Sequence, residues 1–222
     1  ANIKMKIGWR NYRQSGNYGG LAPAYYENAY ELLDEEGEFY TDKHEGYVYY
    51  KPRKNEDITT AEVIMPVSEK LINVKGTLDN FVSGISFVNL SFAYTSWEYV
   101  NMPHGLVTVQ NNILNPSEVG DQSYPTAAVN VSAAEYVNFE KCRFYGLGIN
   151  GLNMMEGINN CNVSGNEFSD ISGTAMCFGD VANKNKNPID KRITLNNNAI
   201  TNNYFHDSPA EFQSGGTLTI GL

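Results

Sequence analysis

Four acidic residues in the second half of the chain are spaced so that they could act together. Glu156 and Asp180 each lie three residues beyond the middle of a short apolar segment, and 24 residues separate them. If those segments pair as neighbouring parallel strands, the two positions stand about 4.8 Å apart. Like charges that close raise the pKa of one partner, as an acid/base pair requires. Hydrolysis of glycosidic bonds uses carboxyl pairs about 5–5.5 Å or about 6.5–9.5 Å apart.

Further candidates surround this pair. Asp207 and Glu211, in "HDSPAEFQSGG", lie just before the next strand segment, so we expect them to reach the same region. His206 could tune Asp207, and His104 lies in a long insertion that also carries Trp97, whose ring could stack on a sugar. Each residue also has a structural interpretation, because turn carboxylates are often solvated and histidine and tryptophan often only pack.

A repeated pattern predicts the elements that position these residues. The segments "AVNV", "GLNM", "AMCF" and "TLTI" begin at residues 128, 151, 175 and 217, and each is apolar at its second and fourth positions. A second set of segments ends in phenylalanine, at Phe92, Phe144, Phe168 and Phe205. A recurring spacing of 20–50 residues indicates stacked repeats that share one core.

These repeats predict an all-β fold, a right-handed parallel β-helix, over residues 61–222. Amphipathic helices and a leucine-rich consensus are absent, and parallel connections are generally right-handed. Val131, Met154 and Phe178 should then be vertical neighbours in the core. Alternation along the strands should send Asn130 and Asn153 outward, as possible sugar contacts in a groove.

The first 60 residues differ from the rest in composition and in the pattern of their apolar residues. Residues 1–24 read as an irregular lead-in rich in glycine, asparagine, tyrosine and arginine. Ala29, Leu32 and Leu33 share one face of a predicted short helix. The segments "EFYTD" and "YVYYKP" then alternate on either side of a polar turn ending in Gly46, which predicts a β-hairpin.

Composition excludes several classes of function. The formal net charge is −9, without the basic stripe that a nucleic-acid partner requires. No apolar run approaches the roughly 20 residues that span a membrane. The three cysteines lack the spacing of a zinc site, and no loop of oxygen ligands suggests calcium. We therefore expect no metal and no other cofactor.

Several longer stretches resemble the right-handed parallel β-helix glycoside hydrolases of bacteria that degrade carbohydrates. They are "ENAYELLDEEGEFYTDKHEGYVYYKP", "GISFVNLSFAYTSW", "AAVNVSAAEYVNFEKCRFYGLGINGL" and "NNYFHDSPAEFQSGGTLTIGL". The resemblance implies a secreted or periplasmic enzyme that cleaves glycans with two carboxylates. It implies the acidic positions of Asp180, in "FGD", and Glu211, in "AEFQSGG".

Two interpretations of function stay open at this point. The first is a glycoside hydrolase, or a fragment of one. Asp180 and Glu211 are its favoured acid/base or nucleophile candidates, and Glu156 and Asp207 come next. The second is a non-catalytic carbohydrate-binding or adhesive module, which binds glycans without turnover. The final "GGTLTIGL" reads as a strand, so we expect a piece of a longer protein or self-association through this end.

Overall fold

The computed structural model describes residues 28–99, 107–109, 112–115, 123–180, 187–212 and 214–221. The chain divides into two compact units, and the described residues of these units are 28–64 and 65–221. Among the described residues, no helix has the length and apolar character needed to cross a membrane.

The smaller unit is built on an antiparallel hairpin. Strands β1 (Phe39–Asp42) and β2 (Tyr47–Tyr50) pair from Phe39 opposite Tyr50 to Asp42 opposite Tyr47, which confirms the predicted hairpin. Gly46 adopts a φ of 75° and donates its N–H to Asp42 O at 2.8 Å, closing the turn. The predicted helix is only a 3-10 turn, η1 (Tyr30–Leu32), without a buried residue. Its apolar face meets too little covering surface to sustain a longer helix.

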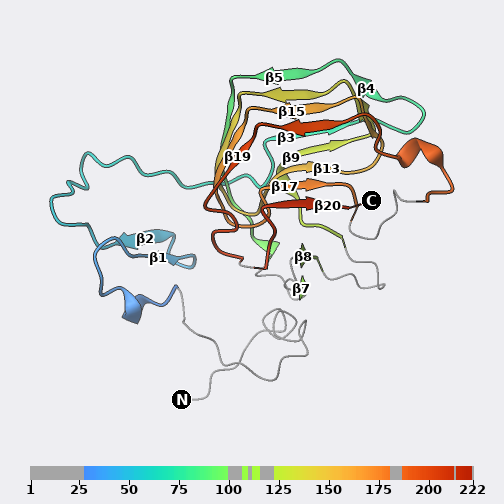
Figure 1. Ribbon diagram of the computed structural model, residues 1–222. Coiled ribbons are helices and arrows are strands. Elements are labelled where there is room, and N and C mark those ends of the chain that lie inside the picture. The colour runs from blue at the N-terminus through green and yellow to red at the C-terminus, as the bar shows by residue number, and fades with distance from the viewer. Residues whose placement is uncertain are drawn as a thin grey trace. The chain divides into compact units, whose positions relative to one another are not determined.

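The larger unit consists mainly of four parallel sheets (Figure 1), each named here after one of its strands. The β13 sheet has the order β20 (Leu218–Ile220), β17 (Met176–Phe178), β13 (Asn150–Met154), β9 (Ala127–Ser132) and β3 (Ile72–Lys75). The β12 sheet has the order β19 (Tyr204–Phe205), β16 (Glu167–Ile171), β12 (Arg143–Leu147) and β6 (Ser91–Thr95).

The other two parallel sheets have shorter strands. The β11 sheet has the order β18 (Ala199–Thr201), β15 (Asn162–Ser164), β11 (Asn138–Glu140) and β5 (Ser86–Val88). The β10 sheet has the order β14 (Ile158–Asn159), β10 (Ala134–Glu135) and β4 (Val82–Ser83). An antiparallel pair, β7 (Val107–Val109) with β8 (Asn112–Leu114), and one 3-10 turn, η3 (Lys191–Ile193), complete the described elements.

The predicted fold class, a right-handed parallel β-helix over residues 61–222, is corrected by this architecture. The described residues form an all-β arrangement of separate, flat, stacked sheets that are mostly parallel, and no solenoid is indicated. The prediction extended a local spacing to the whole chain. That spacing is 23 residues from Val129 to Leu152 and 24 from Leu152 to Met176, but 42 from Met176 to Leu218. A pairing register is a local property, and it does not establish a continuous winding.

The predicted pairing of individual strands is observed. Met154 pairs with Val131 on one side and with Phe178 on the other, and all three side chains are at least nine-tenths buried. The predicted column of phenylalanines is also present. Phe144 stacks on Phe92 at 4.8 Å and on Phe168 at 4.5 Å between ring centroids. Stacked buried rings of this kind contribute about 0.5–1.5 kcal/mol per pair beyond their burial.

Buried asparagines stabilise the turns between sheets. Asn166 accepts a hydrogen bond from Cys142 N at 2.8 Å, donates to Phe139 O at 2.9 Å, and donates to Asn203 Oδ1 at 2.9 Å. Asn203 accepts in turn from Asn166 N at 2.9 Å. The amides thus satisfy backbone groups that leave the ladders where the strands end.

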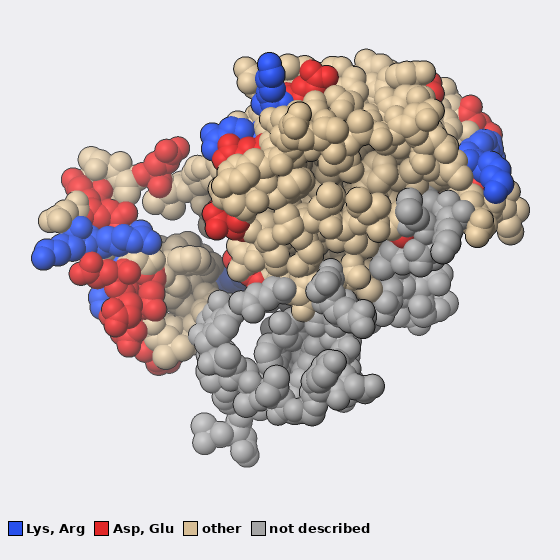
Figure 2. Space-filling view, in the orientation of Figure 1, with Lys and Arg blue, Asp and Glu red and all other residues tan. Residues whose placement is uncertain are grey.

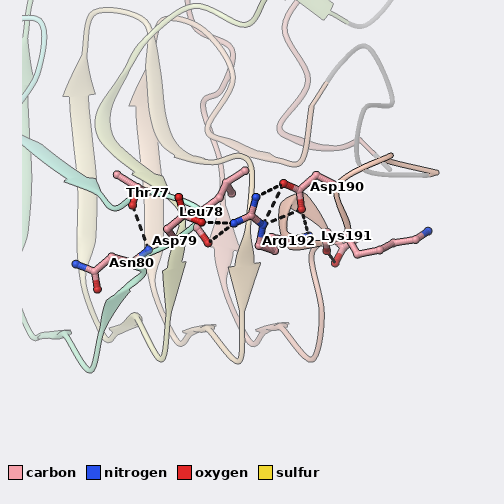
Figure 3. A network of polar contacts seen from close by, with 8 residues as sticks. Thr77, Leu78, Asp79, Asn80, Asp190, Lys191 and Arg192 are labelled. Atoms are coloured by element: carbon pink, nitrogen blue, oxygen red, sulfur yellow. Dashed lines mark hydrogen bonds and ion pairs between the residues drawn. The ribbon is translucent and has the colours of Figure 1, made fainter.

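A cluster of charged residues beside the β3–β4 turn joins segments far apart in the sequence (Figure 3). The guanidinium of Arg192 donates from Nε to Asp190 Oδ1 at 2.9 Å, and from Nη1 to the carboxylate of Asp79. Asp79 belongs to the turn that links β3 and β4, which Thr77 and Asn80 close through reciprocal backbone hydrogen bonds of 3.0 Å. We call this set of contacts the Arg192 clasp.

Candidate functional site

An open cavity of about 320 Å³ lies at one end of the β12 sheet. Its lining combines acidic, aromatic and hydroxyl side chains with exposed backbone, contributed by Thr95, Trp97, Gly146, Leu147, Gly148, Asp170, Ser172, Glu211 and Phe212. These residues come from three strands, β6, β12 and β16, and from the segments that follow β6, β12, β16 and β19.

The backbone turns at the same place in each strand that forms this corner. Tyr94, Gly146, Asp170 and Asp207 occupy equivalent positions in the register and have φ values of 62°, 61°, 50° and 48°. This left-handed conformation is uncommon for residues other than glycine. Glycine at position 146 suits both the positive φ and the close approach of the Tyr94 ring, which would lie 3.0 Å from an added Cβ. The turn leaves Asp170 exposed at the cavity while the following Ile171 enters the core.

An aromatic pair forms one wall of the cavity. The ring of Trp97 meets that of Phe212 edge-on, at 5.2 Å and 86°, and stacks on Tyr99 at 6.2 Å. Backbone hydrogen bonds fix the segment that carries Phe212. Both Glu211 N and Phe212 N donate to Ser172 O, at 3.2 and 2.8 Å, and Ala210 N donates to Ile171 O at 2.8 Å. Hydrogen bonds therefore fix this segment to the end of β16, the strand that carries Asp170.

A chain of charged groups runs across the outer face of the β12 sheet to this corner. Arg143 Nε lies 3.0 Å from Glu167 Oε2, and Glu167 Oε1 lies 3.4 Å from His206 Nε2. His206 Nδ1 lies 2.8 Å from Asp207 Oδ2. Hydrogen bonds from His206 and then Arg143 lower the pKa of Glu167, and those with Asp207 and then Glu167 raise the pKa of His206.

Among the residues singled out in the sequence, the structure brings Glu211 and Trp97 together in the cavity. Asp207 lies two residues after β19, in the segment next to Asp170, and its backbone O accepts a hydrogen bond from Ile171 N at 3.3 Å. His206 is one residue away and contacts Asp207 directly. These predicted residues thus gather at one corner, with Asp170 added by the structure.

Asp180 and Glu156 lie elsewhere. They follow β17 and β13 at equivalent register positions, as expected, and both are half-buried. However, the cavity lies before β17, at Ser172, whereas Asp180 lies after it. The structure therefore separates Asp180 and Glu156 from Glu211 by the length of a strand.

The side chains of the two asparagines expected to contact sugar hydrogen-bond the backbone of their own protein. Asn153 is 3% exposed and donates to Pro125 O at 2.8 Å. Asn130 is half-buried, donates to Ala127 O at 2.7 Å, and accepts from Ala127 N at 3.1 Å. These contacts support the backbone of residues 125–127. His104 lies outside the described residues.

Sequence reasoning missed Asp170, Ser172 and Phe212. A signal for Asp170 existed, because it lies two residues beyond Phe168, just as Gly146 and Asp207 lie two residues beyond Phe144 and Phe205. A glycine and two aspartates at one repeat position indicate a left-handed turn. Within the described ranges, His, Cys, Asp and Glu side chains do not gather in threes as ligands of a metal ion would.

The surface charge has no continuous basic region in the view of Figure 2. On that face, lysine and arginine side chains lie in small groups beside aspartate and glutamate. Charges of both signs are therefore interspersed on this face.

Comparison with known proteins finds one informative relationship. No family model matches the chain, and the search of curated proteins finds no match. A solved structure described as "Glycoside hydrolase" is similar, with a TM-score of 0.69 and 32% sequence identity over 83% of this chain. The chain spans only 35% of that structure's length. The protein is thus related in sequence and structure to part of a glycoside hydrolase.

Proposed function

We propose that the cavity lined by Trp97, Asp170, Glu211 and Phe212 binds a carbohydrate and that its two carboxylates hydrolyse a glycosidic bond. One observation carries this proposal. A single open cavity combines an aromatic wall with carboxylates from two separate segments of the chain. The proposal replaces Asp180 by Asp170 as the partner of Glu211.

The residue types suit the two parts of this task. Aromatic rings offer apolar faces against which sugar C–H groups pack, and Trp97 and Phe212 supply two of them. Ser172 lies beside them in the lining and adds a hydroxyl group, which can hydrogen-bond a sugar oxygen. The buried Thr95 hydroxyl accepts a hydrogen bond from Gly148 N at 3.1 Å and supports the backbone of the lining.

The carboxylates would divide the chemistry between them. One protonates the glycosidic oxygen as the bond to the anomeric carbon breaks. The other attacks that carbon or activates a water molecule, depending on the separation of the two carboxyl groups. Asp170 belongs to β16, and Glu211 is held by its backbone bond to Ser172. Both carboxylates therefore start from fixed backbone positions, as such a reaction requires.

The similarity to a glycoside hydrolase supports a carbohydrate as the ligand. The chain spans about a third of that structure, and we propose that this third is sufficient for hydrolysis. A non-catalytic carbohydrate-binding module would use the same aromatic wall without turnover.

Aryl glycosides and oligosaccharides, assayed for both turnover and affinity, test the proposal. We expect Glu211→Gln and Asp170→Asn each to lower kcat by about 10²–10⁴-fold, the range for general acid–base groups, with affinity largely retained. Trp97→Ala should weaken oligosaccharide binding at least about tenfold, because one stacking surface is lost.

Glu156→Gln and Asp180→Asn are the matched controls, since they remove the same charges at the other end of the strands. Both should keep wild-type kcat. Wild-type turnover in Glu211→Gln and Asp170→Asn would refute the catalytic assignment. Binding that depends on Trp97, without turnover by the wild type, would identify a binding module.

A further inference from the structure

We propose that His206 is a positioning residue whose protonated ring holds the segment 207–212, and with it Glu211 and Phe212, against the cavity. The proposal deepens the proposed function and rests on it only in naming a carbohydrate as the ligand. The geometry of the wall can be tested without any ligand.

The ring of His206 lies between two acceptors. Nδ1 is 2.8 Å from Asp207 Oδ2, and Nε2 is 3.4 Å from Glu167 Oε1. An ionised carboxylate can only accept hydrogen bonds, so both ring nitrogens must donate to make both contacts. Only the imidazolium form carries two N–H groups. The neutral ring keeps one donor and must give up one of the two carboxylates.

Two carboxylates near His206 favour the positively charged ring. Strand β16 contributes Glu167, and the segment after β19 contributes Asp207. On β19, directly before His206, the Tyr204 ring stacks on the imidazole at 4.6 Å. Strand β12 contributes Arg143, whose charge is engaged by Glu167 at 3.0 Å and which also lies over the Tyr145 ring.

Asp170 adds a further negative charge near this site. It lies two residues beyond Phe168, as Asp207 lies two residues beyond Phe205, and the hydrogen bond from Ile171 N to Asp207 O holds the two segments side by side here. A protonated His206 offsets part of their repulsion. When that proton is lost, Asp207 and Asp170 are left as unbalanced like charges.

The segment links His206 to the cavity within six residues. Its backbone is bonded to β16 and the residues after it, from Ile171 N to Asp207 O and from Phe212 N to Ser172 O. The Ser208 hydroxyl donates to Gly173 O at 3.1 Å. The side-chain bridge at the start of this segment adds a restraint to these bonds, and we expect its loss to loosen the position of Phe212 against Trp97.

The direction of the pH effect follows from the raised pKa of His206. The bridge to Asp207 and Glu167 is complete below the ordinary histidine value of about 6.5. It is lost as the pH rises through the raised value. The cavity wall should thus be ordered at acidic pH and loosened at alkaline pH.

Tryptophan fluorescence tests the proposal directly. In a Trp9→Phe background, Trp97 is the single tryptophan and reports its contact with Phe212. We expect its emission to change between pH 5 and 9 with a midpoint above about 6.5. His206→Gln should show the alkaline spectrum at every pH, whereas His44→Gln should keep the transition. An unchanged transition in His206→Gln, or none in the parent, would overturn the proposal.

Asp207→Asn provides a second test that keeps the ring, and it decides the matter if His206→Gln fails to fold. The midpoint should fall toward about 6.5, because the main partner of the charged ring is lost. An unchanged midpoint would contradict the bridge. Oligosaccharide affinity should fall over the same pH range as the fluorescence changes. A fluorescence transition without sugar binding at any pH would sink the proposed function and leave the role of His206 standing.

Discussion

The β13 and β12 sheets both direct alternate side chains to an outer face. That face is covered on the β13 sheet and open on the β12 sheet. On the β13 sheet, Asn153 and Cys177 are neighbours in an outward row, yet they are 3% and 0% exposed. On the β12 sheet, Arg143 is exposed, and Glu167 and His206 are half-buried. The difference lies in what covers each sheet, since Pro125 accepts a hydrogen bond from Asn153.

The polar side chains on the covered face of the β13 sheet are buried and stabilise the fold. Burial raises the pKa of Cys177 and of Tyr124, so these groups stay neutral at ordinary pH. On the open face, Arg143, Glu167 and His206 contact one another, and the segment after β19 lines the cavity. Polar side chains in equivalent positions thus stabilise the fold where they are covered and can serve a ligand where they are open.

The core that both faces share should be the most sensitive part of this unit. Phe168→Ala removes a fully buried ring stacked between Phe144 and Phe205. We expect it to lower the free energy of unfolding by about 3–5 kcal/mol. Chemical denaturation measures this loss. A change below about 1 kcal/mol would mean that the phenylalanine column is not a shared core.

Asn153→Leu should separate the covered face from the open one. It removes a buried amide that bonds Pro125 O at 2.8 Å, so unfolding should become easier by about 1–3 kcal/mol. Ser169→Ala, on the open face, should change stability by at most about 0.5 kcal/mol. Equal losses in the two variants, measured by denaturation, would remove the distinction between the faces.

The charged chain on the open face should respond in a graded way. NMR titration should give His206 a pKa above its ordinary value, because Asp207 and then Glu167 stabilise its charged form. Asp207→Asn should lower that pKa more than Glu167→Gln does. The reverse order would show that the interaction at 3.4 Å, not the one at 2.8 Å, dominates.

The Arg192 clasp should give the smallest effect on stability, because its charges are solvent-exposed. Hydrogen bonds from Arg192 lower the pKa of Asp190 to about 2. The clasp is therefore present above the ordinary aspartate value and is lost as the pH falls through about 2. Arg192→Gln should raise the pKa of Asp190 in an NMR titration and leave the melting temperature almost unchanged. An unmoved pKa would show that the pair does not form.

Much of the strand pairing could be predicted because paired residues repeat the same chemical character. Phe92, Phe144, Phe168 and Phe205 share one column, and Asn166 and Asn203 share one turn. The hairpin was equally visible in its alternation and its glycine turn. These features depend on residues of one chemical character recurring at corresponding places in short segments, which a sequence displays directly.

The covering of each sheet and the overall fold class could not be read in the same way. Alternation marks Asn153 as outward but does not reveal that Pro125 lies over it. The position of Phe212 beside Trp97 joins residues 115 apart in the sequence, outside any repeat. Asp180 and Glu156 share a register as expected, but the cavity forms at the other end of the strands.

A crystal structure of the Glu211→Gln variant with a bound oligosaccharide tests the central claim most directly. A sugar ring should pack on Trp97 and Phe212, with a glycosidic oxygen within about 3 Å of the side chain of residue 211 or 170. A sugar bound instead beside Glu156 and Asp180, with the Trp97 cavity empty, would contradict the assignment of this corner as the site.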